Sequence, residues 1–217
     1  MNQTSQHNSA KPQLYGASYS VYVRIVLLTL NEKQIDFDFY EVDIFDKKTI
    51  PKDYIKSNPF TKIPIFKYDG LTIYETSAIT RYIEDAFEKP PLLYPFNVKE
   101  RAQVNQIISI LDNYAYKALV WDIYVEACES GTPDNTAIEQ ALVFANTCLQ
   151  ALEDIVHGHE HLIGDSLSAA DLHAAPMFNY FMKSPQGQEI LPSYPKLTYW
   201  WNNMKKRPKC QRLFNAN

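Results

Sequence analysis

The sequence predicts an α/β half followed by an all-helical half. In roughly the first 90 residues, extended runs and helical stripes follow the order strand, helix, strand, and then strand, strand, helix. After a segment with three prolines within six residues, every periodic segment is helical. The length of 217 residues allows one large or two small domains at about 150 residues per domain. We therefore expect domains at residues 13–88 and 98–217, joined by a linker.

The first expected unit is a strand, a helix and a second strand. The segment QLYG ends a short strand at Gly16, and the apolar residues between Val23 and Leu30 follow the i, i+3, i+4, i+7 spacing of a buried helical stripe. Residues 36–44 alternate apolar and acidic side chains, which predicts a strand. A helix of about 13 residues between two strands is a crossover, so the two strands should be parallel.

The second expected unit is a hairpin followed by a helix. Residues 63–70 and 71–75 are extended runs joined across Asp69-Gly70, a sequence typical of tight hairpin turns. The two strands should therefore be antiparallel. A helix then begins at Thr76 and ends before Lys89, which precedes two prolines.

The helical half should contain at least three helices. Residues 101–129 and 136–156 carry apolar side chains at helical spacing. A third helix opens at Ser168, where Asp171 three residues later makes an aspartate variant of the capping box, and Pro176 should bend it.

Composition excludes several classes of protein. The chain is 46% apolar and 21% charged, as is typical of soluble globular proteins. Its formal net charge of −4 gives no overall electrostatic reason to expect nucleic acid or an anionic membrane as partner. The six glycines are too widely spaced for a dinucleotide-binding or P-loop motif.

The cysteines favour a reducing compartment. Cys128, Cys148 and Cys210 are isolated and odd in number, without the spacing of a redox pair or a zinc knuckle. The polar first residues and Arg24 within the most apolar run signal neither secretion nor membrane insertion. We therefore expect a cytoplasmic protein.

Two conspicuous segments predict no metal or nucleic-acid site. The segment HGHEH at 157–161 lies among glycines, which favours a turn over a metal site. The basic segment MKKRPKCQR at 204–212 is better explained as a lysine-rich last helical turn before Pro208.

Three motifs in the first half resemble those of the cytosolic glutathione transferase family. They are GASYS at 16–20, NPFTKIPIF at 58–66 and YETSAI at 74–79, in the family's order and spacing. The start is most similar to the phi class, in which a serine four residues after the glycine precedes the first helix. The likeness is close over the first 90 residues and looser beyond. It implies a thioredoxin-like glutathione-binding domain at 13–88 and a helical domain at 98–217 that contributes the electrophile pocket.

The resemblance places the glutathione backbone on two of these motifs. A cis bond at Ile63-Pro64 would turn the flanking backbone outward, so that Ile63 pairs with the cysteinyl residue of glutathione as an added strand. The helix start at Glu75-Thr76 would receive the γ-glutamyl carboxylate, with Glu75 holding the ammonium group. The alternatives are an ordinary trans proline opening an edge strand and a Thr76 that is only a helix cap.

Lysines are the candidates for the glycyl carboxylate of glutathione. Lys62 occupies the family's Gln/Lys position before Ile63, whereas Lys47 and Lys48 lie in a loop of variable length. A lysine in a loop can equally be a solvated charge.

The thiol of glutathione would be the nucleophile, activated by a hydroxyl group. Its unperturbed pKa of about 8.5 leaves little thiolate at neutral pH, so a donor at a helix N-terminus should stabilise the anion. Ser20 is the first candidate, Ser18 the second and Tyr19 the third; Ser20 acting only as a helix cap is the alternative. No cysteine lies between Gly16 and Arg24, which favours attack on an electrophile over thiol–disulfide exchange.

The expected activity is conjugation of glutathione to hydrophobic electrophiles, a detoxification reaction. Tyr114, Tyr116 and Trp121 are candidates for the electrophile pocket, although aromatic residues at this spacing are also common in cores. The family implies a homodimer that uses glutathione as cosubstrate, and we expect no other cofactor. The charge, the apolar runs and the residue spacing described above also lead us to expect no metal, nucleic acid or membrane partner. The alternatives are a ligand-binding or regulatory protein of the same fold, and a glutathione-dependent isomerase or peroxidase.

Overall fold

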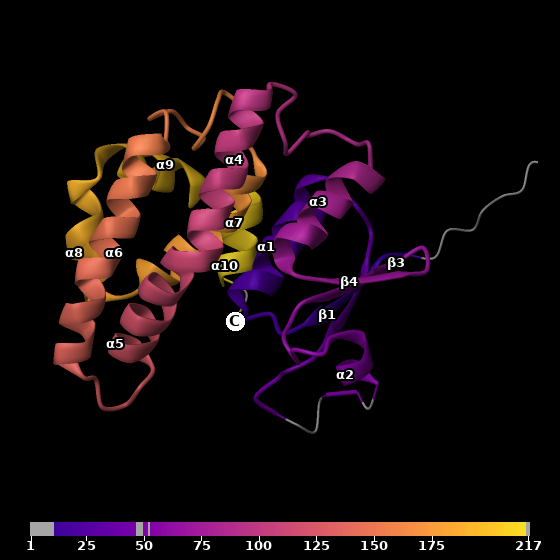
Figure 1. The fold of residues 1–217 in the computed structure, drawn as a ribbon, viewed down its shortest axis with the longest axis horizontal. Helices are drawn as coiled ribbons and strands as arrows, with labels where there is room; N and C mark the ends of the chain where they lie inside the picture. The colour runs from indigo at the N-terminus through magenta and orange to yellow at the C-terminus, as the bar shows by residue number, and fades with distance from the viewer. Residues whose placement is uncertain (1–10, 47–49, 52, 216–217) are drawn as a thin grey trace, which may run out of the picture. The chain divides into compact units, whose positions relative to one another are not determined.

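The computed structural model describes residues 11–46, 50–51 and 53–215 (Figure 1). The chain divides into two compact units, Met1–Ile83 and Glu84–Asn217.

The first unit is built on a four-stranded sheet in the order β2-β1-β3-β4. Strands β1 (Gln13–Gly16) and β2 (Asp38–Glu41) are parallel, as predicted for the crossover unit. Strands β3 (Ile65–Tyr68) and β4 (Leu71–Tyr74) form the predicted antiparallel hairpin, and β3 also pairs antiparallel with β1. Strand β2 is shorter than the predicted 36–44, because β1 offers only four residues for pairing.

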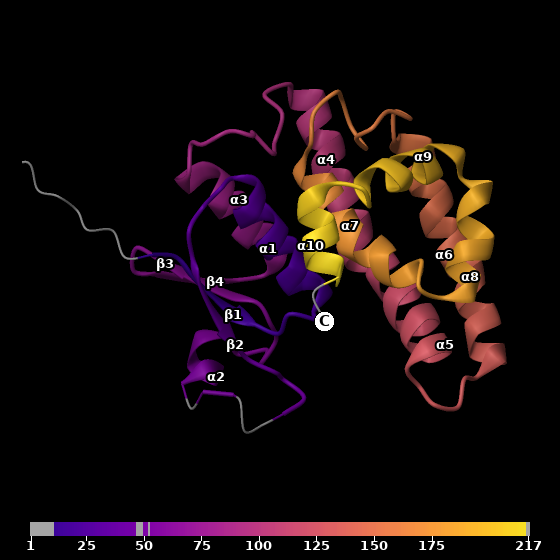
Figure 2. The same cartoon turned by 180° about the vertical axis from the view of Figure 1, so that it is seen from behind.

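Two long helices of this unit cover one face of the sheet. Helices α1 (Val21–Glu32) and α3 (Thr76–Ala86) lie beside one another over the strands, and the short α2 (Tyr54–Ser57) lies on the opposite side (Figures 1 and 2). Leu14 of β1, Phe66 of β3 and Val26 of α1 are fully buried. Helix α2 was not predicted, since four residues are too few to show a helical period.

The second unit is entirely helical. A continuous helical run extends from α4 (Val98–Ile110) through two π-helical segments, η1 (Leu111–Ala115) and η2 (Lys117–Val125), to α5 (Glu126–Cys128). The remaining elements are α6 (Asn135–Ile155), α7 (Ala169–Phe181), α8 (Pro185–Ile190), η3 (Leu191–Ser193), α9 (Pro195–Met204) and α10 (Pro208–Asn215). The predicted helices at 101–129 and 136–156 are therefore present, but the change to a π-helix was not predicted.

Helix α7 is the core of the second unit, and its start is tied down by a buried carboxylate. The predicted capping box of Ser168 and Asp171 is present, and α7 contains Pro176. Asp171 Oδ2 accepts from the Ser168 backbone N–H and hydroxyl, both at 2.8 Å. Asp171 Oδ1 accepts from the Leu162 backbone N–H and from Trp200 Nε1, also at 2.8 Å. One side chain therefore connects three segments of the unit.

The histidine-rich and basic segments lie in connections between helices. Residues 157–161 form a non-helical loop after α6, as predicted. Helix α9 ends at Met204, so Lys205, Lys206 and Arg207 lie in the turn before α10 and not in a last helical turn; that prediction was wrong, because Pro208 begins a helix of its own. Among the described helices, none combines the length and the apolar character needed to cross a lipid bilayer.

Candidate functional site

The strand register brings the predicted glutathione-binding motifs to one end of the sheet. Tyr15, Ile65 and Tyr74 are paired in one row across β1, β3 and β4. The chain leaves this row from β1 into residues 16–20, enters it through Ile63-Pro64, and leaves it again at Glu75. Three segments that are far apart in sequence therefore meet at the same edge.

Gly16 allows the first helix and the segment before β3 to approach this edge closely. A Cβ atom on Gly16 would overlap the side chain of Val23 and would lie 3.5 Å from Cβ of Ile63. The glycine is thus required by space, since no room remains for a side chain at this position.

Ser20 is the N-cap of α1. Its backbone is extended, with φ −66° and ψ 128°, and its Oγ accepts from the Val23 backbone N–H at 3.4 Å. A serine hydroxyl that accepts one hydrogen bond still has its own proton to donate. Ser20 can therefore cap the helix and donate to an anion at the same time, so the two interpretations of this residue do not exclude each other.

The two rival hydroxyl residues have different surroundings. The Tyr19 hydroxyl donates to Asp43 Oδ1 at 2.6 Å, and its ring stacks on Phe45 with centroids 6.4 Å apart. The backbone of Ser18 is held at both polar groups, because its N–H donates to Glu41 Oε1 at 3.3 Å and its carbonyl accepts from Arg24 Nε at 2.8 Å. Of these two residues, it is Tyr19 whose hydroxyl proton is already donated to a carboxylate.

The segment before β3 is held by two donors that the sequence interpretation did not select. The Ile63-Pro64 peptide bond is cis. The Lys62 carbonyl accepts from the Tyr54 hydroxyl at 2.8 Å and from Asn58 Nδ2 at 2.9 Å. Burial raises the pKa of Tyr54, so this phenol stays a donor. The asparagine of the NPF motif was a visible signal for this role, whereas Tyr54 carried none.

The buried Asn58 side chain also shapes the turn that leads to Lys62. Its Oδ1 accepts from the Phe60 backbone N–H at 3.0 Å, while its Nδ2 donates to Lys62 as described. Asn58 is 2% exposed, so both bonds are shielded from water. The motif therefore has a structural basis in this turn.

The start of α3 has the geometry expected of an anion-binding helix end. Thr76 is the first residue of α3 and is buried, and Glu75 before it is exposed and adopts φ 70°. The Glu75 carbonyl accepts from the Ile79 backbone N–H at 2.9 Å, which is the first bond of the helix. The N–H groups of the first turn are then the unpaired donors that such a helix offers to a carboxylate.

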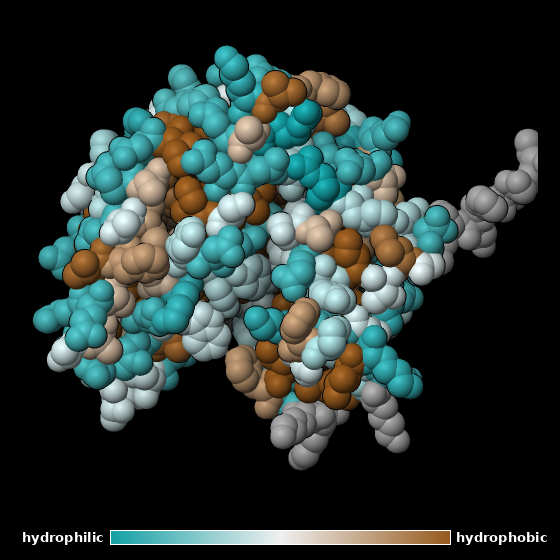
Figure 3. Space-filling view, in the orientation of Figure 1, coloured by the Kyte–Doolittle hydropathy of each residue, from teal (hydrophilic) through white to brown (hydrophobic). Residues whose placement is uncertain are grey.

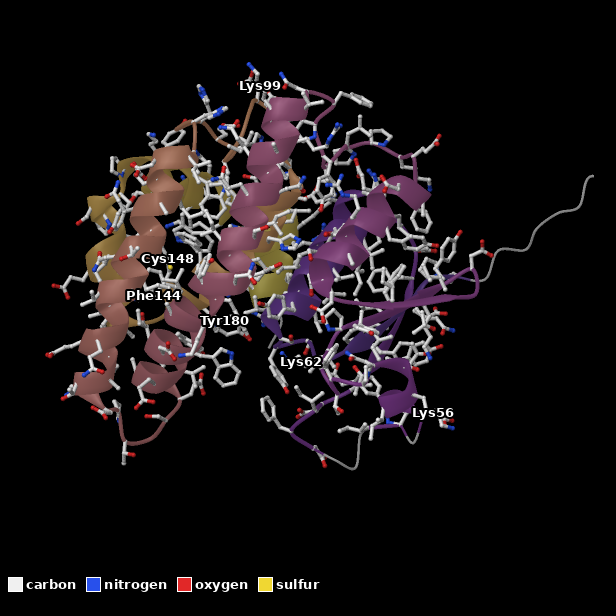
Figure 4. All side chains as sticks on the ribbon, in the orientation of Figure 1. Lys56, Lys62, Lys99, Phe144, Cys148 and Tyr180 are labelled. Carbon is white, nitrogen blue, oxygen red and sulfur yellow. The ribbon has the colours of Figure 1, made fainter. Side chains whose placement is uncertain are left out.

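Of the predicted lysines, only Lys62 lies among the described residues. Its side chain is exposed in the loop that precedes β3 (Figure 4). Lys47 and Lys48 lie outside the described residues.

The predicted electrophile-binding residues lie on the π-helical part of the second unit. Tyr114 is 52% exposed and packs edge-on against Phe144 of α6 at 6.4 Å, and Trp121 is 44% exposed. Tyr116 lies between the two π-helical segments, and burial raises its pKa, so its phenol remains a neutral donor. Figure 4 labels Phe144 together with Cys148, one turn further along α6, and Tyr180 of α7.

Comparison with known proteins connects both units to one family. The model of the glutathione S-transferase N-terminal domain matches residues 14–91, and that of the C-terminal domain matches residues 132–215. Glutathione S-transferase F13 of Arabidopsis thaliana is 29% identical over 90% of this chain and 91% of its own length. Glutathione S-transferase F6 of the same plant is 27% identical over 93% of this chain and 98% of its own length.

Solved structures agree with the sequence matches. The crystal structure of glutathione transferase F7 from Populus trichocarpa has a TM-score of 0.81 at 30% identity and covers 93% of this chain and 97% of its own. A structure of glutathione S-transferase I bound with lactoylglutathione has a TM-score of 0.80 at 25% identity and covers 94% of this chain and 99% of its own.

Proposed function

Because the chain belongs to the glutathione S-transferase family, we propose that it conjugates glutathione to hydrophobic electrophiles and that the Ser20 hydroxyl stabilises the glutathione thiolate. The observation that carries the assignment is the position of Ser20 at the N-terminus of α1, with a proton left to donate. The Tyr19 hydroxyl already donates its proton in a hydrogen bond to Asp43. Ser18 remains the second candidate.

The available interactions are strong enough for this role. Lowering the thiol pKa by about two units requires roughly 2.7 kcal/mol of preference for the anion. A hydrogen bond to a charged group contributes about 1.5–3 kcal/mol. The N-terminal end of a helix adds about 0.3–1 kcal/mol. One serine at the start of α1 therefore suffices without a metal ion or a protein cysteine.

The rest of the tripeptide is assigned to the same edge of the sheet. The Ile63 backbone pairs with the cysteinyl residue, the start of α3 at Thr76 binds the γ-glutamyl carboxylate, and Glu75 holds the ammonium group. Lys62 is assigned to the glycyl carboxylate, and Lys48 keeps the same assignment although it lies outside the described residues. These contacts fix the thiol at the Ser20 hydroxyl.

The reaction needs only glutathione and the electrophile. The thiol loses its proton to solvent, and the thiolate forms a sulfur–carbon bond with the electrophilic carbon. The leaving group departs with its electron pair, or, in an addition, solvent supplies a proton. Tyr114, Tyr116 and Trp121 provide aromatic surface for a hydrophobic electrophile, and the neutral Tyr116 phenol can donate to an anionic product.

We assign the protein to the cytoplasm as a homodimer in which the α/β half of one subunit faces the helical half of the other. Cys128, Cys148 and Cys210, which all lie among the described residues, form no disulfide bonds, and this suits a reducing compartment. Phe60 and Ile55 are 63% and 61% exposed, and such apolar side chains favour burial in an interface. Figure 3 shows several hydrophobic residues, in brown, at the surface of the first unit.

Binding and turnover measured on the same preparation test the proposed function. Calorimetry should detect glutathione binding, and a chlorodinitrobenzene should be converted to its glutathione conjugate with release of chloride. Binding of glutathione without conversion of any member of a panel of aryl halides, epoxides and unsaturated carbonyl compounds would favour a ligand carrier instead. Formation of oxidised glutathione would favour the peroxidase alternative. Recovery of unchanged reduced glutathione after isomerisation of the substrate would favour the isomerase alternative.

A further inference from the structure

The loop between β1 and α1 carries three hydroxyl groups, and a residue outside that loop accepts a hydrogen bond from one of them. Ser18, Tyr19 and Ser20 follow one another, so the sequence alone leaves the choice among them open. Selection of one thiol donor among these hydroxyls rests on the proposed function.

The Tyr19 hydroxyl is held by a carboxylate that is itself fixed. Asp43 Oδ1 accepts from the Tyr19 hydroxyl at 2.6 Å and from the Phe45 backbone N–H at 2.8 Å. The bond from Tyr19 lowers the pKa of Asp43 most, and the backbone bonds from Phe45 and Asp46 lower it further, so the carboxylate is charged at neutral pH. The ring of Tyr19 also stacks on Phe45. Both ends of the tyrosine side chain are therefore directed toward residues 43–45.

The sheet places Asp43 beside the hydroxyl loop. Gly16 of β1 is paired with Glu41 of β2, and the Val42 backbone N–H donates to the Gly16 carbonyl at 3.0 Å. The segments that follow β1 and β2 therefore leave the sheet side by side, and residue 43 lies next to the residues after Gly16. Glu41 reinforces this by accepting from the Ser18 backbone N–H.

We propose that Asp43 is a positioning residue that selects Ser20 as the thiol's hydrogen-bond donor by holding the competing hydroxyl of Tyr19. A phenol has one proton, and while it is donated to Asp43 it cannot be donated to sulfur. Ser20 instead accepts from its own helix and keeps its proton. The serine-type chemistry of this loop then depends on a residue 23 positions after Ser20.

A test must separate two effects of Asp43 on the thiol: the electrostatic effect of its charge and the effect of its hydrogen bond with Tyr19. Removing a carboxylate near the thiol favours the thiolate through electrostatics alone. Among the described residues, the nearby charged groups include Glu41 and Asp46, which are exposed, and Arg24, whose Nε donates to the Ser18 carbonyl. Asp46 offers a matched control, because Asp46→Ala removes the same charge three residues away and keeps both side chains of the Tyr19–Asp43 hydrogen bond.

The test follows the pKa of the thiol of bound glutathione, read from the ultraviolet absorbance of the thiolate across pH in the full-length protein. Ser20→Ala should raise this pKa by about 1–2 units. Adding Asp43→Ala to that variant should lower it again by at least about half a unit, which is about threefold more thiolate at a fixed acidic pH. Adding Tyr19→Phe as a third change should remove this recovery.

Several results would overturn the proposal. Recovery that persists in the triple variant, or that Asp46→Ala reproduces, would assign the effect to charge. No recovery in the Ser20→Ala, Asp43→Ala variant would show that Tyr19 is not a competing donor. These results leave Ser20 as the thiol's donor, whereas a Ser20→Ala variant with unchanged thiol pKa would reject the role that the proposed function gives to Ser20. Unchanged melting temperatures serve as the folding control, since Tyr19 and Asp43 lie at the surface.

Discussion

The candidate functional residues of the two units differ in how the fold constrains them. In the first unit, the candidate site is defined by backbone: a glycine without room for a side chain, an N-cap serine, a turn built on Asn58 and a helix start at Thr76. In the second unit, the candidate residues are exposed aromatic side chains on a π-helical run. Backbone recognition suits an invariant peptide, whereas exchangeable side chains suit electrophiles of varied shape.

The largest effect is expected from the buried carboxylate that organises the helical unit. Asp171→Ala removes the capping box and leaves the Leu162 N–H and Trp200 Nε1 without their acceptor. The loss should be about 3–5 kcal/mol in the free energy of unfolding, combining a cap with two buried donors. Urea unfolding measures it, with the exposed Asp154→Ala as control. Equal stability of the two variants would contradict the role given to Asp171.

The next effect should appear in the first unit, at the close approach of Gly16. Gly16→Ala places a Cβ atom against Val23 and Ile63, and overpacking of this kind costs about 1–3 kcal/mol. Glutathione affinity, measured by calorimetry, should fall with it, because the overlap with Val23 shifts α1 and its N-cap Ser20. Val23→Ala in the same chain opens the space and should restore binding. Persistent loss in the double variant would separate Gly16 from this contact.

A comparison of two asparagines tests whether the turn before β3 serves binding. Asn58→Ala should cost about 1–2 kcal/mol in stability and also weaken glutathione binding, because the Lys62 carbonyl loses a donor. Asn97→Ala, which removes the N-cap of α4 in the second unit, should cost about 1 kcal/mol in stability with no change in glutathione affinity. Equal glutathione affinities of the two variants would refute the distinction.

The smallest expected change in stability concerns the aromatic residues of the second unit. Trp121→Ala should raise KM for a hydrophobic electrophile a few-fold and leave both glutathione affinity and melting temperature unchanged, since Trp121 is 44% exposed. Tyr199→Ala, at a similarly exposed aromatic residue of α9, is the control and should not affect KM. If the two variants change KM for the electrophile equally, the assignment of Trp121 to the electrophile pocket is wrong.

The parts of the fold that were predictable are those encoded by neighbouring residues. Asp69 and Gly70 both adopt positive φ, 47° and 75°, which is the two-residue hairpin turn that their sequence predicts. The capping box of Ser168 and the start of α3 at Thr76 are local signals in the same sense. The π-helical stretch was not predictable, because a few wide turns hardly alter the apolar spacing of a long helix.

The contacts that were missed depend on the path of the folded chain and not on a local sequence pattern. Asp43 lies 24 positions from Tyr19, and neither residue carries a motif that points to the other. The bond from Tyr54 to Lys62 likewise depends on the path of the loop before β3. The sequence leaves three neighbouring hydroxyls as candidates for the thiol's donor, and the structure adds that the Tyr19 hydroxyl donates to Asp43, a contact that only the folded sheet creates.

A crystal structure of the protein with bound glutathione would test the central claim most directly. Our account predicts the sulfur atom within hydrogen-bonding distance of Ser20 Oγ, with the Tyr19 hydroxyl still on Asp43. A sulfur atom bound by the hydroxyl of Ser18 or Tyr19, or a glutathione molecule that does not contact the backbone of Ile63, would contradict it.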